Sequence, residues 1–122
     1  MTVSVVIPTL GRASLRRAVQ SALAQTEPVA QVVVVADTDQ PVDVPDDGRV
    51  TLLRNEIAAG PATSRQRGID AATGSVIALL DDDDEWLPDK MRRQLPAVAD
   101  AGPHWIASSR IAVVGPGDRH RE

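Results

Sequence analysis

Four consecutive aspartates at residues 81–84 directly follow an apolar run at residues 76–80. A buried strand that ends in four carboxylates concentrates negative charge where the backbone leaves the core, and the repulsion is costly unless water or a cation intervenes. Mg²⁺ and Mn²⁺ prefer hard oxygen ligands, and an ion held by one or two carboxylates keeps coordination sites open for phosphate. The pattern therefore indicates either a divalent metal site or a solvated acidic turn.

Apolar, β-branched runs predict the strands that position these carboxylates. They occupy residues 3–7, 32–35, 50–53 and 76–80. Their nearly continuous apolar character is typical of strands that are covered on both faces, as in a parallel sheet.

Helical periods separate several of these strands. Residues 15–23 show an i, i+3, i+4 apolar pattern with Ser14 as a candidate N-cap, and a second helix is predicted at about residues 62–72. A third helix can begin at Pro88, and Pro96 is expected to end or kink it. Strands that alternate with helices predict an α/β layered fold with right-handed crossovers.

Two further segments complete the expected architecture. Residues 38–49 are rich in Asp, Pro and Gly and predict an exposed loop, whereas residues 105–114 predict a fifth and last strand. We expect one domain over residues 1–115, followed by a polar tail over residues 116–122.

Polar residues follow each of the four predicted strands. They are Pro8 and Thr9, then Asp37, then Asn55, and finally the aspartates. Since ligands of open α/β sheets bind at the carboxyl ends of the strands, these positions predict one ligand-lined crevice.

A predicted helix that carries Arg65 and Arg67 begins near this crevice. Residues two apart on a helix do not face the same way, and Arg65 lies nearer the helix start, so it is the candidate anion ligand. Backbone amides at a helix start and one guanidinium suit a diphosphate. With a metal site, this predicts a nucleoside diphosphate ligand, for which Asp37 could accept a hydrogen bond from a base N–H and Thr9 could meet the base or ribose. The alternative is that both arginines only solvate an exposed helix face.

Three ordered motifs carry a family resemblance. Val-Ser-Val-Val-Ile-Pro-Thr at residues 3–9, Ser-Ala-Leu-Ala-Gln-Thr at residues 21–26 and Leu-Asp-Asp-Asp-Asp-Glu-Trp-Leu-Pro at residues 80–88 resemble family 2 glycosyltransferases of the GT-A fold. The resemblance implies a three-layer α/β/α fold with a mostly parallel sheet, here truncated after the fifth strand. It also implies a metal-dependent, inverting transfer of sugar from a nucleotide-diphosphate sugar, most commonly a uridine diphosphate sugar, to an acceptor that the motifs do not specify.

The resemblance also implies roles for individual residues. Asp83 would bind the divalent metal, Mg²⁺ or Mn²⁺, within a DxD-type motif, although four aspartates leave the register of that motif open by one residue. Asp37 would meet the base, and Arg65 would lie near the base and diphosphate. The full set of implied nucleotide-sugar ligands is Pro8, Thr9, Asp37, Arg65, Asp81 and Asp82.

Two departures from the family pattern affect what we expect. Ala36 replaces the first of the paired aspartates that the family usually shows after its second strand, so base recognition could be altered. The family also continues into an acceptor-binding half that carries the catalytic base, whereas this chain stops at Glu122 and we identify no base in it. The alternative function is therefore a nucleotide-sugar-binding module or fragment that is catalytically inert alone.

The amino-acid composition argues against several other classes of protein function and kinds of site. A net charge of −4, two aromatic residues and no cysteine disfavour nucleic-acid binding and exclude disulfides and thiolate sites. No run is long enough for a membrane span or signal peptide, so we expect a cytoplasmic location. A sheet edge near the C-terminus could pair with a second copy to form a homo-oligomer.

Two other enzyme and signalling classes fit the residues less well. A phosphate-receiver domain needs an acidic pair after its first strand and a later lysine, but Thr9 stands at that position and Lys90, the only lysine, lies on a predicted helix. A sugar nucleotidyltransferase needs a Gly-rich arginine loop at its opening, which this chain lacks.

Overall fold

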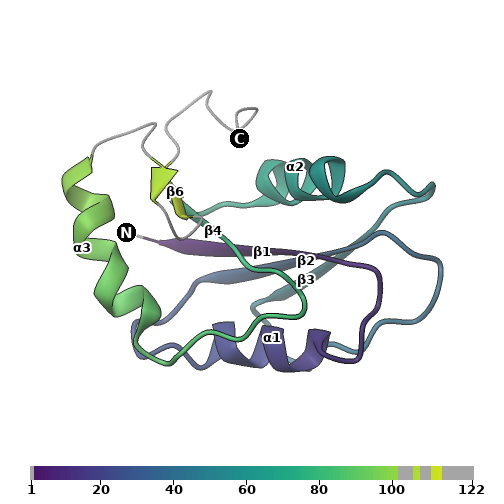
Figure 1. The fold of residues 1–122 in the computed structure, drawn as a ribbon, viewed down its shortest axis with the longest axis horizontal. Helices are drawn as coiled ribbons and strands as arrows, with labels where there is room; N and C mark the ends of the chain where they lie inside the picture. Colours follow the sequence, from purple (N-terminus) through teal and green to yellow (C-terminus); the bar gives the residue numbers. More distant parts are fainter. Residues whose placement is uncertain (1, 102–105, 108–110, 114–122) are drawn as a thin grey trace.

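A computed structural model describes residues 2–101, 106–107 and 111–113 of the chain (Figure 1). The described strands form one sheet in the order β3-β2-β1-β4-β6-β5. Neighbours among the first four strands in this order are parallel, whereas β6 pairs antiparallel with both β4 and β5. The strands are β1 (Val3–Thr9), β2 (Gln31–Ala36), β3 (Val50–Arg54), β4 (Val76–Leu79), β5 (Ile106–Ala107) and β6 (Ile111–Val113).

Helices cover both faces of this sheet. Helix α1 (Leu15–Leu23) and helix α2 (Pro61–Ala71) lie on opposite faces, and helix α3 (Lys90–Ala101) lies near the end of the sheet at which the chain begins (Figure 1). The arrangement confirms the predicted three-layer fold with a mostly parallel sheet.

Alternation along the strands explains the continuous valine runs. Successive side chains of a strand point to opposite faces. In β2, Val32 and Val34 therefore join the core cluster that contains α1, while Val33 and Val35 join the cluster that contains Ile69 of α2. Both faces of β2 are therefore buried, which explains why its residues are continuously apolar instead of alternating between apolar and polar.

The predicted exposed loop is confirmed, because no helix or strand occurs between Ala36 and Val50. The helix predicted at residues 62–72 is α2, which begins at Pro61, directly after Gly60. Since proline lacks an N–H and has a fixed φ, it is well suited to the first turn of a helix.

The C-terminal part differs from expectation in two ways. Helix α3 does not end at Pro96 but continues to Ala101, because a proline removes only one backbone donor, so of the two effects expected of this residue the kink stays a prediction. Instead of one fifth strand over residues 105–114, the chain forms the two short antiparallel strands β5 and β6. The predicted tail at residues 116–122 lies outside the described residues.

Among the described residues, no helix is both long enough and apolar enough to cross a membrane.

Candidate functional site: an acidic cleft at the carboxyl edge of the sheet

A cleft of about 350 Å³ opens at the carboxyl edge of the parallel strands. The cleft is lined from both sides, by the end of β1 and the loop after β4 and by the start of α2. All the residues expected to bind the nucleotide sugar or the metal lie on it, whereas Asn55 does not. Its lining residues are Pro8, Thr9, Leu10, Arg12, Asp37, Pro61, Ser64, Arg65, Asp81, Asp82 and Asp83.

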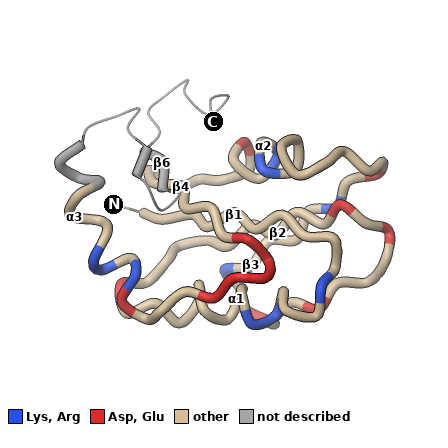
Figure 2. The backbone as a smooth tube through the Cα atoms, viewed as in Figure 1, with Lys and Arg blue, Asp and Glu red and all other residues tan. Residues whose placement is uncertain are grey.

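The aspartate side chains of the acidic loop, residues 81–85, point in two different directions. This loop runs along α1 and forms the longest red stretch of the backbone in Figure 2. Asp81, Asp83 and Asp84 offer carboxylate oxygens that all lie within 4.8 Å of one another. We call these three residues the acidic cluster.

The acidic cluster fits a small divalent cation. Two oxygens bound to one Mg²⁺ lie about 3–4.2 Å apart for a metal–oxygen bond of ~2.1 Å, so oxygens within 4.8 Å of one another can reach one ion by side-chain movements of about 1–2 Å. Asp83 and Asp84 are exposed and Asp81 is half-buried, which leaves room on the ion for water and phosphate. Oxygen-only ligands favour Mg²⁺ or Mn²⁺ over softer metals.

Asp82 points away from the acidic cluster and into a buried hydrogen-bond network. The Thr9 hydroxyl donates to Asp82 Oδ2 at 2.6 Å, and the Gly11 amide donates to Thr9 Oγ1 at 2.9 Å. The Ser14 hydroxyl donates to the Asp82 carbonyl at 2.8 Å. Ser14 is the N-cap residue of α1, as expected, and its carbonyl accepts from the Ala18 amide at 3.1 Å. Its hydroxyl forms no capping hydrogen bond but fastens the acidic loop to α1.

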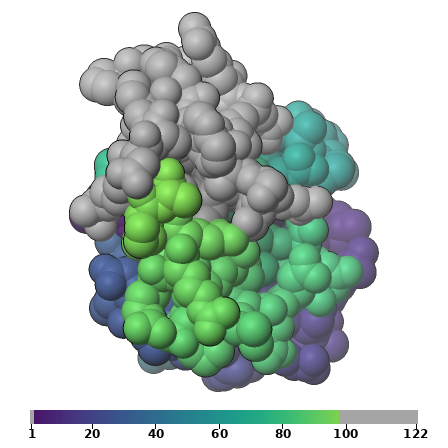
Figure 3. Space-filling model, turned by 60° about the vertical axis from the view of Figure 1, so that its left-hand side comes forward, coloured from purple at the N-terminus to yellow at the C-terminus, as the bar shows by residue number. Residues whose placement is uncertain are grey.

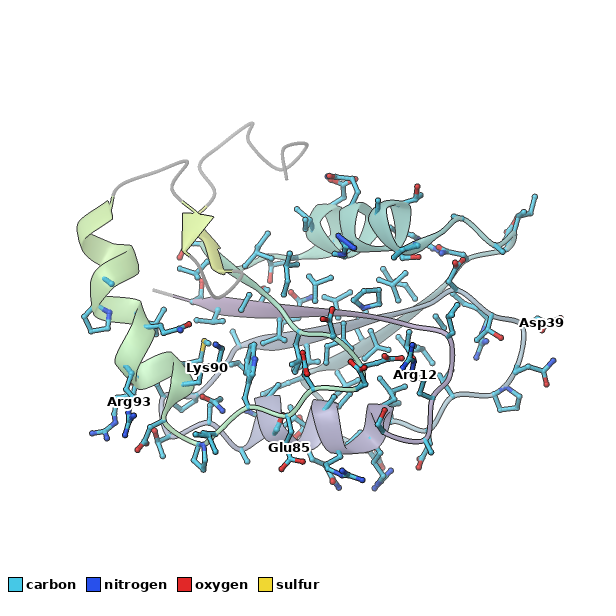
Figure 4. The ribbon with its side chains drawn as sticks, viewed as in Figure 1. Arg12, Asp39, Glu85, Lys90 and Arg93 are labelled. Atoms are coloured by element: carbon cyan, nitrogen blue, oxygen red, sulfur yellow. The ribbon has the colours of Figure 1, made fainter. Side chains whose placement is uncertain are left out.

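Arg12 supplies the cation that faces this part of the cleft. Its Nε lies 3.5 Å from Asp82 Oδ1, and its Nη1 lies 3.5 Å from Asp83 Oδ2. Figure 4 shows its side chain directed from the loop after β1 toward the carboxylates. Arg12 was not among the residues expected from the sequence. The glycine before it was the available sequence signal of a sharp turn at the end of β1, and its φ in the structure is 92°.

Asp37 organises the loop on the opposite wall. Its carboxylate accepts hydrogen bonds from Asn55 Nδ2 at 2.9 Å, from the Ala59 amide at 2.8 Å and from the Gly60 amide at 2.9 Å. These hydrogen bonds hold the pKa of Asp37 below its ordinary value, and the bond from Asn55 contributes most. The residue predicted to meet a base is therefore also the anchor of the segment that leads into α2.

The two arginines of α2 point in different directions, as their spacing predicted. Arg67 donates to the Arg54 carbonyl at 2.7 Å and to Asn55 Oδ1 at 2.8 Å, and it does not line the cleft. Arg65 lines the cleft, and among the described residues it forms no ion pair. Asn55 lies behind the cleft wall instead of on it, where its amide joins Asp37 to Ser64.

A parallel α/β sheet with an acidic, arginine-flanked cleft beyond its strand ends defines a class of nucleotide-binding folds. The protein-family model that matches the chain is "Glycosyl transferase family 2", over residues 4–121. The chain belongs to glycosyl transferase family 2.

Individual relatives and solved structures agree with this family. The chain is 42% identical over 103 residues to the succinoglycan biosynthesis protein ExoO of Rhizobium meliloti (strain 1021), covering 80% of this chain and 29% of that relative. It is 36% identical over 126 residues to a glucosyl-dolichyl phosphate glucuronosyltransferase of Haloferax volcanii, covering 88% of this chain and 40% of the relative. The crystal structure of S. aureus TarS superposes with a TM-score of 0.66 at 20% identity, over 82% of this chain and 20% of TarS, and it supports the GT-A fold.

Proposed function

We propose that this chain binds a nucleotide-diphosphate sugar in the acidic cleft and contributes the donor half of a metal-dependent, inverting glycosyltransferase. The observation that carries the proposal is the convergence of the acidic cluster, Arg65 and Asp37 on one cleft at the carboxyl edge of the sheet. The relatives ExoO and the Haloferax enzyme are 29% and 40% covered by this chain, so the acceptor and the activity of the whole protein are part of the proposal.

Each wall of the cleft has a proposed task. Pro8 and Thr9 at the end of β1 bind the nucleoside, and Asp37 meets the base. Arg65 contacts the base and diphosphate from the start of α2, where the first backbone amides of the helix also favour an anion. Asp81 and Asp82 approach the ribose and the sugar. Uridine diphosphate is the proposed nucleotide, since TarS residues 1–349 have been crystallised with UDP and with UDP-GlcNAc.

The acidic cluster is proposed to hold Mg²⁺ or Mn²⁺, with Asp83 as the principal ligand. A cation bound there would neutralise charge on the departing diphosphate. The chain's own contribution is to position carboxylates on a loop that α1 fastens through Ser14, so that the ligands need little rearrangement. We assign no catalytic base to the described residues. The cytoplasmic location and self-association stay predictions from the sequence.

The proposal is tested by incubating the chain with radiolabelled UDP-glucose or UDP-N-acetylglucosamine and Mn²⁺, and measuring both donor binding and release of UDP. Metal-dependent binding with UDP release supports a transferase that can use water as an acceptor. Metal-dependent binding without release supports the alternative, a donor-binding module that is inert alone. If neither sugar nucleotide bound at millimolar concentration, both the transferase and the donor-binding module would be contradicted.

A further inference from the structure

Arg12 lies beside the acidic cluster and has no task in the function proposed above. Its guanidinium contacts Asp82 from one side and Asp83 of the acidic cluster from the other, each at 3.5 Å (Figure 4). It therefore places a positive charge next to the carboxylate that is proposed as the principal metal ligand. The same side chain lines the cleft, so it is within reach of whatever enters.

The two contacts of Arg12 are weak. Charge-assisted hydrogen bonds between nitrogen and carboxylate oxygen are usually about 2.7–2.9 Å long, well below the 3.5 Å seen here. The Arg12 side chain is 58% exposed, and exposed ion pairs contribute little to stability. The guanidinium can therefore leave the carboxylates without disturbing the fold.

The backbone that carries Arg12 is held much more firmly than its side chain. The preceding Gly11 has a φ of 92°, which favours glycine, and its amide donates to Thr9 Oγ1 at 2.9 Å. Thr9 is 4% exposed and its hydroxyl donates to Asp82 at 2.6 Å. A long, exposed cation thus extends from a fixed point on the cleft wall, and Arg65 of α2 lines the same cleft.

We propose that Arg12 is the internal counter-cation of the acidic cluster in the unliganded protein and moves onto the diphosphate when a metal-bound nucleotide enters the cleft. The inference rests on the proposed function, because it needs a metal and a nucleoside diphosphate in this cleft. With a divalent cation bound, Asp83 would serve as its ligand, and the Arg12 guanidinium would exchange Asp83 for the phosphate oxygens of the nucleotide. The diphosphate is then held by arginines from both walls, Arg12 and Arg65.

This exchange predicts effects of opposite sign on two ligands. Without nucleotide, Arg12 competes with the metal for Asp83, so its removal should strengthen metal binding. With metal present, Arg12 contacts the diphosphate, so its removal should weaken nucleotide binding. A residue that only stabilised the acidic loop would weaken both kinds of binding.

The chain offers a matched control in Arg17. Its Nε lies 3.8 Å from Glu85 Oε1, both side chains are more than half exposed, and it does not line the cleft. Arg17→Gln therefore removes the same charge beside the same loop without touching the proposed contacts. Arg12→Lys keeps the charge of Arg12 but not its forked geometry.

The experiment titrates wild type, Arg12→Gln, Arg12→Lys and Arg17→Gln with Mn²⁺ alone, and then with UDP at saturating Mn²⁺, by calorimetry. For Arg12→Gln we expect a Kd for Mn²⁺ about threefold lower than that of wild type, as for loss of a weak exposed ion pair. Its Kd for UDP should be about tenfold higher, as for loss of a charge-assisted contact. Arg17→Gln should change both by less than about twofold, and Arg12→Lys should recover part of the UDP affinity.

Equal values for Arg12→Gln and Arg17→Gln, or weaker binding of both ligands by Arg12→Gln, would overturn the inference while leaving the proposed function intact. A wild-type chain that binds neither Mn²⁺ nor UDP would overturn the proposed function, and this inference with it.

Discussion

At the scale of single residues, neighbouring aspartates of the acidic loop have different partners. Asp82 is 8% exposed and bound by Thr9, whereas Asp83 next to it is exposed in the acidic cluster. The residues alone indicated either a metal site or an acidic turn, and the family resemblance left the register of the four aspartates open by one residue, because identical side chains in a row carry no signal of direction. The contacts of Thr9 and Ser14, which lie some 70 residues away in the chain, decide it.

A first prediction separates these aspartates. Asp83→Asn should raise the Kd for Mn²⁺ by roughly tenfold or more, since even changes outside the ligand shell of a metal site cause such losses. Asp46→Asn, on the exposed loop between β2 and β3, removes an acidic charge away from the cleft and should leave the Kd nearly unchanged. Paramagnetic resonance of free Mn²⁺ gives both values. Equal Kd values for the two variants would remove Asp83 from the metal site.

A second prediction concerns pH and Asp37. Because hydrogen bonds lower its pKa in the folded chain, its stabilising effect is present above the pKa of the unfolded state and is lost as pH falls through the lower folded value. Below about pH 4, the protection factors of the Ala59 and Gly60 amides, which compare their exchange with that of an unprotected amide at the same pH, should therefore fall. Hydrogen exchange read by NMR measures this locally.

The control for this pH effect is Asp37→Asn. In this variant the protection factors of the two amides should be low already at neutral pH, and acidification should lower them no more than those of distant loops. Protection factors of these amides that are the same in wild type and Asp37→Asn at neutral pH would contradict the role of Asp37 as anchor of the loop before α2.

At the scale of secondary-structure elements, α2 is positioned by close contact with the sheet. A Cβ added to Gly68 would lie 2.4 Å from Val6 Cγ1 and 3.2 Å from Val35 Cγ2. Both valines are fully buried and β-branched, so they cannot turn aside. This packing sets the position of the helix start, and with it the cleft positions of Ser64 and Arg65.

A third prediction follows from this packing. Gly68→Ala should lower the free energy of unfolding by about 1–2 kcal/mol, because overpacking costs ~1–3 kcal/mol and the better helix propensity of alanine returns part of it. Gly48→Ala, whose added Cβ meets nothing within 4 Å, should change it by less than about 0.5 kcal/mol. Urea unfolding followed by circular dichroism compares them. A Gly68→Ala variant as stable as wild type would show that α2 does not depend on this contact.

The sequence predicted those elements that are determined by nearby residues, and it did not predict those that depend on contacts between distant parts of the chain. The valine runs, the helical period of α1 and the proline at the start of α2 are local signals, and they gave the layers and the edge of the sheet on which the cleft lies. The role of Ser14, the continuation of α3 through Pro96 and the division into β5 and β6 depend on tertiary contacts. Propensity alone does not report those contacts.

At the scale of the whole molecule, the cleft combines segments from distant parts of the chain. The ends of β1 and β2, the start of α2 and the acidic loop meet because parallel strands bring their carboxyl ends to one edge. The segment that leads from the acidic loop into α3 forms a continuous green surface in Figure 3. The described chain thus contains a full set of proposed donor ligands.

The most direct test of this account is the binding of UDP by the wild-type chain with and without Mn²⁺, measured by calorimetry. We expect affinity to rise by about tenfold or more when Mn²⁺ is added, a coupling of ~1.4 kcal/mol or more between metal and diphosphate, and Asp83→Asn to abolish that rise while the fold persists. Equal affinity for UDP in the presence and absence of Mn²⁺ would contradict the central claim that the acidic cluster holds a metal that binds the diphosphate.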